Sequence, residues 1–347
     1  MDTFMHRPLL QKLGVALSGA SLALFCGCGS GLGLSGTPVG PSSPIPSATT
    51  NGPQLGYFWN AADSTLRPVM GIPGASQIGA SVVPAGMYTA GAASSASAVA
   101  LLQQSDGSLD AMTLPSGTPT HVSAATTTGA LIRFSPSGKS ALVFTPGASS
   151  VVLVSGLTAT PSASSVTTPF AIQEAALGDS GSFAIATGSA AGASIQIVAA
   201  NGTPTAVGSV GKLGGLAFAS GDGLLFADAS VNTLTLIRNA STSPTTAQVP
   251  TAALLMTPAG LGVSPNGQWV LVANSADPST VRVDLTAQNA PLKIACNCTP
   301  ALVATVAGTA TFRVTAPGNG PIWAVDAGAS TPRSFFIPAL PGTGVQP

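Results

Sequence analysis

The clearest pattern of hydrophobic and polar positions lies in residues 257–285. A short apolar run at 261–263 ends at the tetrapeptide Ser-Pro-Asn-Gly, residues 264–267. Proline fixes φ at the second position of such a turn, and the closing glycine accepts a positive φ. Residues 269–273 then form a continuous apolar run, which predicts a strand buried on both faces.

A second turn at residues 274–278 is followed by an alternating segment, in which Val281, Val283 and Leu285 are separated by polar residues. A period of two places three apolar side chains on one face of a strand. The stretch therefore predicts three antiparallel strands joined by tight turns. Such a unit cannot bury its apolar faces alone, so it needs similar neighbours.

Related turns recur along the chain and close at Gly86, Gly138, Gly181, Gly223, Gly267 and Gly320. Their spacings are 52, 43, 42, 44 and 53 residues, and a period in the low forties is typical of a propeller blade of four strands. Apolar strands are expected after the later turns, at residues 142–145, 183–187, 224–228, 269–274 and 322–326. The regions 77–126 and 297–340 depart from the pattern.

A further copy begins the repeating region, with residues 56–60 followed by 64–69. It lacks the strand that precedes the turn elsewhere, and the last copy lacks an evident outer strand. We predict an all-β fold, a β-propeller of seven four-stranded blades, with six or eight blades as alternatives. We also expect the chain ends to meet, with a strand at 334–340 beside residues 55–70.

The repeat resembles the YVTN-type β-propeller repeat of bacterial envelope proteins. Tyr57-Phe58-Trp59-Asn60 and Leu271-Val272-Ala273-Asn274 occupy the motif positions, and the Ser-Pro-Asn-Gly turn precedes the second of them. The resemblance covers residues 55–340. It implies a fold and a cellular location rather than an activity, because the family hosts many roles on structural repeats.

The first 28 residues resemble a bacterial signal peptide. Arg7 and Lys12 precede an apolar run at 13–25, followed by Cys26 and Cys28. We expect lipid attachment at Cys28, with Cys26 as the alternative residue and plain secretion as the alternative fate. Residues 29–54, rich in Gly, Ser and Pro, predict a flexible tether before a propeller domain at 55–347. The mature chain is thus expected outside the cytoplasm, in the periplasm or anchored to the outer membrane.

Charged residues make up only 6% of the chain, and mean hydropathy is +0.46. The 11 basic and 11 acidic residues balance, so no electrostatic field exists to attract nucleic acid, and we exclude that class of partner. An outer-membrane barrel is disfavoured as well, because it needs aromatic girdles and longer strands. The expected partners are an envelope protein, a glycan and, through a lipid anchor, the membrane.

Groups suited to catalysis are scarce. Glu174 is the only glutamate in the chain, and His121 is the only histidine after residue 28. Asp179 and Asp222 lie in tight turns, where aspartate usually bonds its own backbone instead of calcium. We therefore predict no catalytic residue, no cofactor site and no metal site.

Cys296 and Cys298 are the remaining unusual feature. In an oxidising envelope two neighbouring cysteines seldom stay free. We expect a disulfide that locks the turn before the last blade, with a redox role and two-thiolate metal binding as the alternatives.

These observations favour a non-catalytic binding or scaffolding module. The alternatives are a propeller enzyme, either a hydrolase or lactonase or an electron-transfer subunit, and a surface adhesin. Carboxylates gathered in the channel with His121 or an inward arginine would favour the enzyme; the candidate arginines are Arg133, Arg238, Arg282 and Arg313. An anion site formed by such arginines stays open. The tryptophans Trp59, Trp269 and Trp323 are candidate contact residues, although their strand positions favour packing between blades.

Overall fold

The computed structural model describes residues 52–189, 192–199, 202–306, 310–316 and 320–339. The chain divides into two compact units, 1–50 and 51–347, and only the second is described below. The predicted signal peptide, Cys26, Cys28 and nearly all of the predicted tether lie outside the described residues. No helix in the described part is long and apolar enough to cross a membrane.

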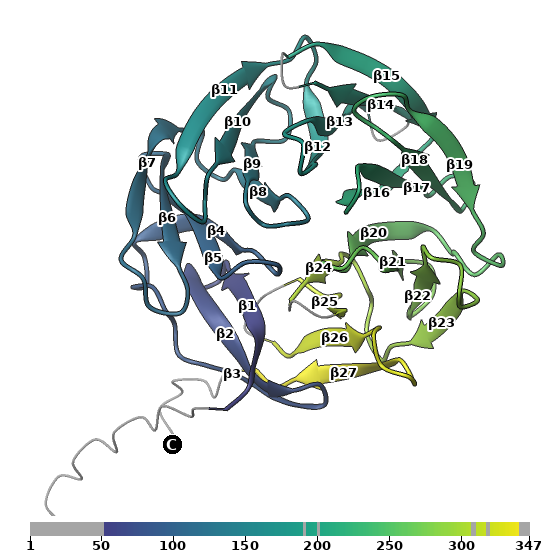
Figure 1. Cartoon of the computed structure of the whole chain (residues 1–347). Coiled ribbons are helices and arrows are strands. Elements are labelled where there is room, and N and C mark those ends of the chain that lie inside the picture. The colour runs from purple at the N-terminus through teal and green to yellow at the C-terminus, as the bar shows by residue number, and fades with distance from the viewer. Residues whose placement is uncertain (1–51, 190–191, 200–201, 307–309, 317–319, 340–347) are drawn as a thin grey trace, which may run out of the picture. The chain divides into compact units, whose positions relative to one another are not determined.

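Seven antiparallel sheets are arranged in a ring (Figure 1). The first sheet contains β1 (Gln54–Asn60), β2 (Thr65–Ile72) and β3 (Ala75–Ile78). The second contains β4 (Tyr88–Ala93), β5 (Val99–Gln104), β6 (Ser108–Thr113) and β7 (Thr120–Ala125). The third contains β8 (Leu131–Phe134), β9 (Ala141–Phe144), β10 (Ser150–Ser155) and β11 (Ser162–Thr167). The fourth contains β12 (Ile172–Leu177), β13 (Phe183–Ser189), β14 (Gly192–Val198) and β15 (Pro204–Val210).

The fifth sheet contains β16 (Leu213–Ala219), β17 (Gly223–Asp228), β18 (Thr233–Arg238) and β19 (Thr245–Val249). The sixth contains β20 (Pro258–Val263), β21 (Trp269–Asn274), β22 (Ser279–Asp284) and β23 (Leu292–Ala295). The seventh contains β24 (Ala304–Thr305), β25 (Thr311–Arg313), β26 (Ile322–Asp326) and β27 (Arg333–Ile337). The predicted seven-bladed β-propeller is confirmed.

The first and last sheets differ from the prediction in detail. β1 lies on the channel side of its sheet, so the first copy has an inner strand and instead ends at β3 with three strands (Figure 1). β27 is the outer strand of the last sheet and pairs only with β26 there. The C-terminal strand expected beside residues 55–70 is thus β27, which is hydrogen-bonded within the last sheet and not to the first.

The turn pattern explains the unequal spacing of the glycines. The turns at 135–138, 178–181, 220–223 and 264–267 all join the inner strand of a sheet to its second strand. The turn that closes at Gly86 precedes the inner strand β4, and Gly320 lies between β25 and β26. These two turns occupy other places in their blades, which produces the longer intervals at each end of the series.

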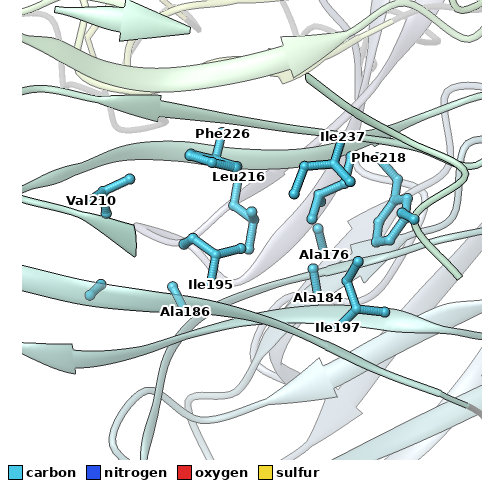
Figure 2. Packing of buried hydrophobic residues seen from close by; sticks show 13 residues of the cluster. Ala176, Ala184, Ala186, Ile195, Ile197, Val210, Leu216, Phe218, Phe226 and Ile237 are labelled. Atoms are coloured by element: carbon cyan, nitrogen blue, oxygen red, sulfur yellow. The ribbon is translucent and has the colours of Figure 1, made fainter. Parts of the chain in front are cut away.

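Adjacent sheets pack face to face through apolar side chains, as Figure 2 shows for the fourth and fifth sheets. The fourth sheet contributes small residues near the channel, among them Ala176 and Ala184, and the fifth sheet contributes Leu216, Phe218 and Phe226. Large side chains on one face fill the space left by small ones on the other. This interdigitation gives the density found in protein interiors.

The ring closes through the same kind of packing. Phe335 and Ile337 of β27 are buried in one cluster with Phe58 of β1 and Val69 of β2. The chain ends therefore do meet, through side chains rather than through a shared sheet. Closure should be sensitive to the volume of the β27 residues that face the first sheet.

We predict that Ile337→Ala lowers the free energy of unfolding by about 2–4 kcal/mol, because the side chain is 1% exposed and its loss leaves a cavity. Phe336→Ala is the matched control on the same strand, since Phe336 is 56% exposed. Its cost should stay below about 1.5 kcal/mol, the value of its ring contact with Trp323. Urea denaturation measures both, and equal losses would contradict closure by this packing.

Candidate functional site

The described residues line two cavities at the centre of the ring. The larger, of about 540 Å³, is bounded by residues from β4, β8, β12, β16, β20, β24 and β25. The smaller, of about 380 Å³, is bounded by β1, β4, β8, β24 and β25. Both are lined by Arg133 and Arg313. Together these central cavities receive residues from every sheet, so they are the natural place to look for a ligand site.

Small residues let the inner strands approach one another around the central cavities. A Cβ atom at Gly260 would lie 2.7 Å from the backbone of Leu302, and one at Gly91 would lie 2.6 Å from the Trp59 ring. Any larger residue at Gly91 or Gly260 would therefore force neighbouring blades apart. The residues that line the cavities are mostly uncharged, and they include glycine and alanine as well as larger apolar residues.

Arg133 and Glu174 form an ion pair on one wall. Arg133 is on β8 and Glu174 on β12, and Nε of the arginine donates to Oε1 at 3.1 Å while Nη2 donates to Oε2 at 3.3 Å. The Phe144 ring lies 5.9 Å from the guanidinium carbon. Two parallel hydrogen bonds fix both groups in one plane. Glu174 is thus occupied as a counterion.

Arg313 differs from Arg133 in having no counterion among the residues that the structure describes. It follows Phe312 on β25, and because Phe312 packs toward the sixth sheet, alternation turns Arg313 toward the first. Its Nη1 atom is buried and has no hydrogen-bond partner. Burial lowers the pKa of Arg313 to about 10, which leaves it charged at neutral pH.

The charged side chains that line the two cavities are Arg133, Glu174 and Arg313. After the ion pair cancels, one positive charge remains. This arrangement can hold an anion. It offers no pair of free acid and base groups, because the single carboxylate already accepts two hydrogen bonds from arginine.

The other two candidate arginines lie elsewhere. Arg238 is exposed at the end of β18. Arg282 is buried on β22, where its guanidinium carbon lies 4.2 Å from the centre of the Trp269 ring and Nη1 donates to the Ala327 carbonyl at 3.1 Å. Burial lowers the pKa of Arg282, and the nearby Asp284 opposes that shift. Arg282 is therefore a packing residue between the sixth and seventh sheets.

His121 lies outside the central cavities, on β7. Its Nδ1 atom is 3.5 Å from Oδ1 of Asp110, and the imidazole is 62% exposed. Asp110 is buried and accepts hydrogen bonds from the Tyr88 hydroxyl at 3.0 Å and from the Gln104 amide at 2.8 Å. Sequence reasoning missed this cluster, because its members come from four strands, β4 to β7, whose register was unknown.

Asp179 and Asp222 each connect two loops. We expected each carboxylate to bond the backbone of its own turn, and neither does. Oδ1 of Asp179 accepts the amide of Ser137, in the corresponding turn of the preceding blade, at 2.9 Å. Oδ2 of Asp222 accepts the amide and the hydroxyl of Ser241 at 2.9 and 2.7 Å. Among the described residues, no three His, Cys, Asp or Glu side chains gather as metal ligands would.

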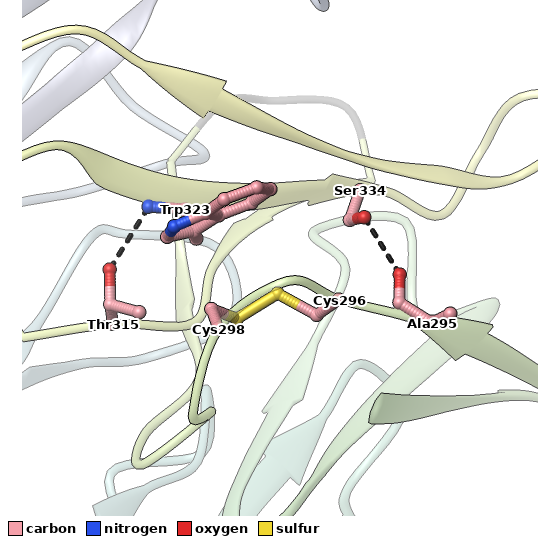
Figure 3. The surroundings of a disulfide bond; sticks show 6 residues. All are labelled: Ala295, Cys296, Cys298, Thr315, Trp323 and Ser334. Carbon is pink, nitrogen blue, oxygen red and sulfur yellow. Dashed lines mark hydrogen bonds between the residues drawn. A yellow bond between two sulfur atoms is a disulfide. The ribbon is translucent and has the colours of Figure 1, made fainter. Parts of the chain in front are cut away.

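Cys296 and Cys298 are joined by a disulfide just after β23 (Figure 3). The Ser334 hydroxyl donates to the Ala295 carbonyl beside it at 2.7 Å, which ties β27 to the sixth sheet. Trp323 and Trp269 pack against the cluster that contains Cys296, and Trp59 packs between the first and second sheets. All three tryptophans therefore serve packing between blades.

Comparison with known protein families and with curated proteins gives no match for this sequence. Solved structures similar to this chain include AztD from Citrobacter koseri, at 13% identity and a TM-score of 0.56, over 83% of this chain and 82% of that one. A streptogramin B lyase has 13% identity and a TM-score of 0.52, over 73% and 84% of the two chains. Kuenenia stuttgartiensis hydrazine synthase has 12% identity and a TM-score of 0.51, over 78% and 96%. At such identities the likeness shows the propeller fold alone.

Tyr88 provides a pH test of the cluster around Asp110. Burial, and then the hydrogen bond and charge of Asp110, raise the pKa of Tyr88 to about 12 from 10.0. Since the folded state holds this proton more tightly, its contribution to stability is complete below pH 10 and is lost as the pH rises toward 12. We predict a tyrosinate absorbance step near pH 12 that disappears in Tyr88→Phe, with circular dichroism monitoring the fold. Loss of a step near pH 10 in the variant would contradict the assignment.

Proposed function

We propose that this chain is an extracytoplasmic, non-catalytic binding or scaffolding protein of the bacterial envelope, built from repeats of the YVTN type. The observation that carries the proposal is the state of Glu174, the one carboxylate that the described residues bring to the central cavities. Glu174 is held by two hydrogen bonds from Arg133, so it is not free to act as a general base or a nucleophile. A propeller hydrolase would need further free acid or base groups there.

Two features of the chain support the proposed location, the first 28 residues and a disulfide in the propeller. Residues 1–28 have the basic start, apolar core and cysteine of a lipoprotein signal, with Cys28 as the proposed lipid attachment site. The disulfide between Cys296 and Cys298 suits an oxidising compartment. A lipid anchor would then hold the propeller at the membrane, facing an envelope protein or a glycan.

The fold itself does not decide between binding and catalysis, because one of the similar propellers is named as a lyase. The distinction rests on the central cavities. In the described part of this chain they bring together two arginines and one paired glutamate.

Fractionation of cells that express the full chain tests the location. We expect the unmodified protein in the membrane fraction and Cys28→Ala released from it, because loss of the acyl chains removes the anchor. Cys26→Ala is the matched control and should stay with the membrane. If Cys26→Ala were released and Cys28→Ala retained, the attachment site would be Cys26. Retention of the unmodified protein in the cytoplasm would refute the proposed extracytoplasmic location.

Cross-linking of the anchored protein in its own envelope, followed by purification and mass spectrometry, tests the binding role. A stoichiometric partner that is recovered with the full chain, and lost when only residues 1–54 are expressed, supports a platform. Turnover of esters or lactones that disappears in Glu174→Gln would show an enzyme instead.

A further inference from the structure

Arg313 stands apart from three other arginines of the ring. Arg67 pairs with Asp63 at 2.6 Å, Arg133 pairs with Glu174, and Arg282 stacks on Trp269. Within the described residues Arg313 has no ion-pair or stacking contact of this kind, and its buried Nη1 atom has no acceptor. Burying a charged N–H group without an acceptor is costly, and an anion bound at Nη1 would remove that cost.

We propose that the two central cavities form one binding site for a small carboxylate anion with a short apolar body, and that Arg313 is the counterion of the carboxylate. The inference rests on the proposed function in one respect: it assumes that the channel binds its ligand without converting it. Arg313 lines both cavities, so one ligand can bind its guanidinium and extend into either of them.

The charge of the lining selects a monoanion. Arg133 and Glu174 cancel each other, and Arg313 supplies the single remaining positive charge. A guanidinium presents parallel N–H groups that match the two oxygens of a carboxylate. A phosphate dianion would carry more negative charge than the site neutralises.

The walls select the rest of the ligand. Apolar residues are among those that line the larger cavity together with Arg313, for example Ile132, Leu261 and Val303. The nearby hydroxyl of Thr305 donates to the Val263 carbonyl at 3.2 Å, and that of Ser264 binds Asn266 at 2.6 Å. With these hydroxyls already bonded, a ligand rich in hydroxyl groups gains little, whereas an apolar body is desolvated favourably.

Glu174 acts as an internal competitor in this scheme. Its carboxylate occupies Arg133, which lines both cavities with Arg313. Replacing Glu174 by glutamine would free a second guanidinium and raise the positive charge of the lining. The site therefore predicts changes of opposite sign from two substitutions on its wall.

Calorimetric titration of the full chain at pH 7 with butyrate, benzoate and inorganic phosphate tests the proposal. We expect saturable binding of a carboxylate, weakened roughly tenfold or more by Arg313→Met because a charge-assisted pair is lost. Arg238→Met, which removes an exposed arginine away from the cavities, should leave affinity unchanged. Glu174→Gln should tighten binding. Arg313→Lys keeps the charge without the planar fork and should fall between the unmodified protein and Arg313→Met.

Thermal unfolding without ligand gives a second readout. Arg313→Met should melt at the same temperature as the unmodified protein or higher, because it removes an uncompensated buried charge, and added carboxylate should stabilise only the unmodified protein. No binding of either carboxylate, equal binding by Arg313→Met, or tighter binding of phosphate would overturn the proposal. Proton NMR of the mixture separates the carboxylate site from the proposed function. An unchanged carboxylate supports both. Conversion of the bound carboxylate would refute the non-catalytic function, but it would still support a carboxylate site at Arg313.

Discussion

Packing between the faces of adjacent sheets is the interaction on which this structure depends. Each sheet is apolar on both faces, so none can be stable alone, and the ring must close before the last apolar face is covered. Because the sheets converge, the space between them narrows toward the channel. Alanine and glycine fill the narrow part, as at Ala176 and Gly260, and phenylalanine or isoleucine fills positions where the packing leaves more room.

The scarcity of charge follows from that construction. Several of the few carboxylates belong to a local motif, in which Asp accepts a hydrogen bond from the hydroxyl of the Ser or Thr two residues later. These are Asp63, Asp106, Asp228, Asp277 and Asp284. Burial by itself raises the pKa of Asp284, but hydrogen bonds from Thr286 and Asn289 outweigh it and lower that pKa. Such turns stabilise the fold above the unfolded pKa and lose that contribution as the pH falls below it. The acids therefore hold turns together and leave the channel almost uncharged.

The repeat could be predicted from sequence because both of its signals are local. The closing glycines and the apolar runs after them located β9, β13, β17, β21 and β26. The prediction failed where the same local signal occurs in another place of the blade: the turn at Gly86 has a proline and a closing glycine, as the turns at Gly138 and Gly267 do, but it precedes an inner strand. Likewise, no sequence feature distinguishes Arg313 from Arg238, because the difference lies in which strand faces the channel.

Arg313 also affects the stability of the whole ring. The protein tolerates a desolvated cation at its centre even though burial lowers the pKa of the group to about 10, and it remains charged at neutral pH. Methionine would fill similar space without that cost, and nothing in the packing of β25 calls for a guanidinium. The neighbouring Phe312 and Val314 supply the apolar contacts that hold the strand. A group that costs stability and contributes no internal bond through its buried nitrogen is explained by what it binds, and an anion bound there would stabilise the folded ring by mass action.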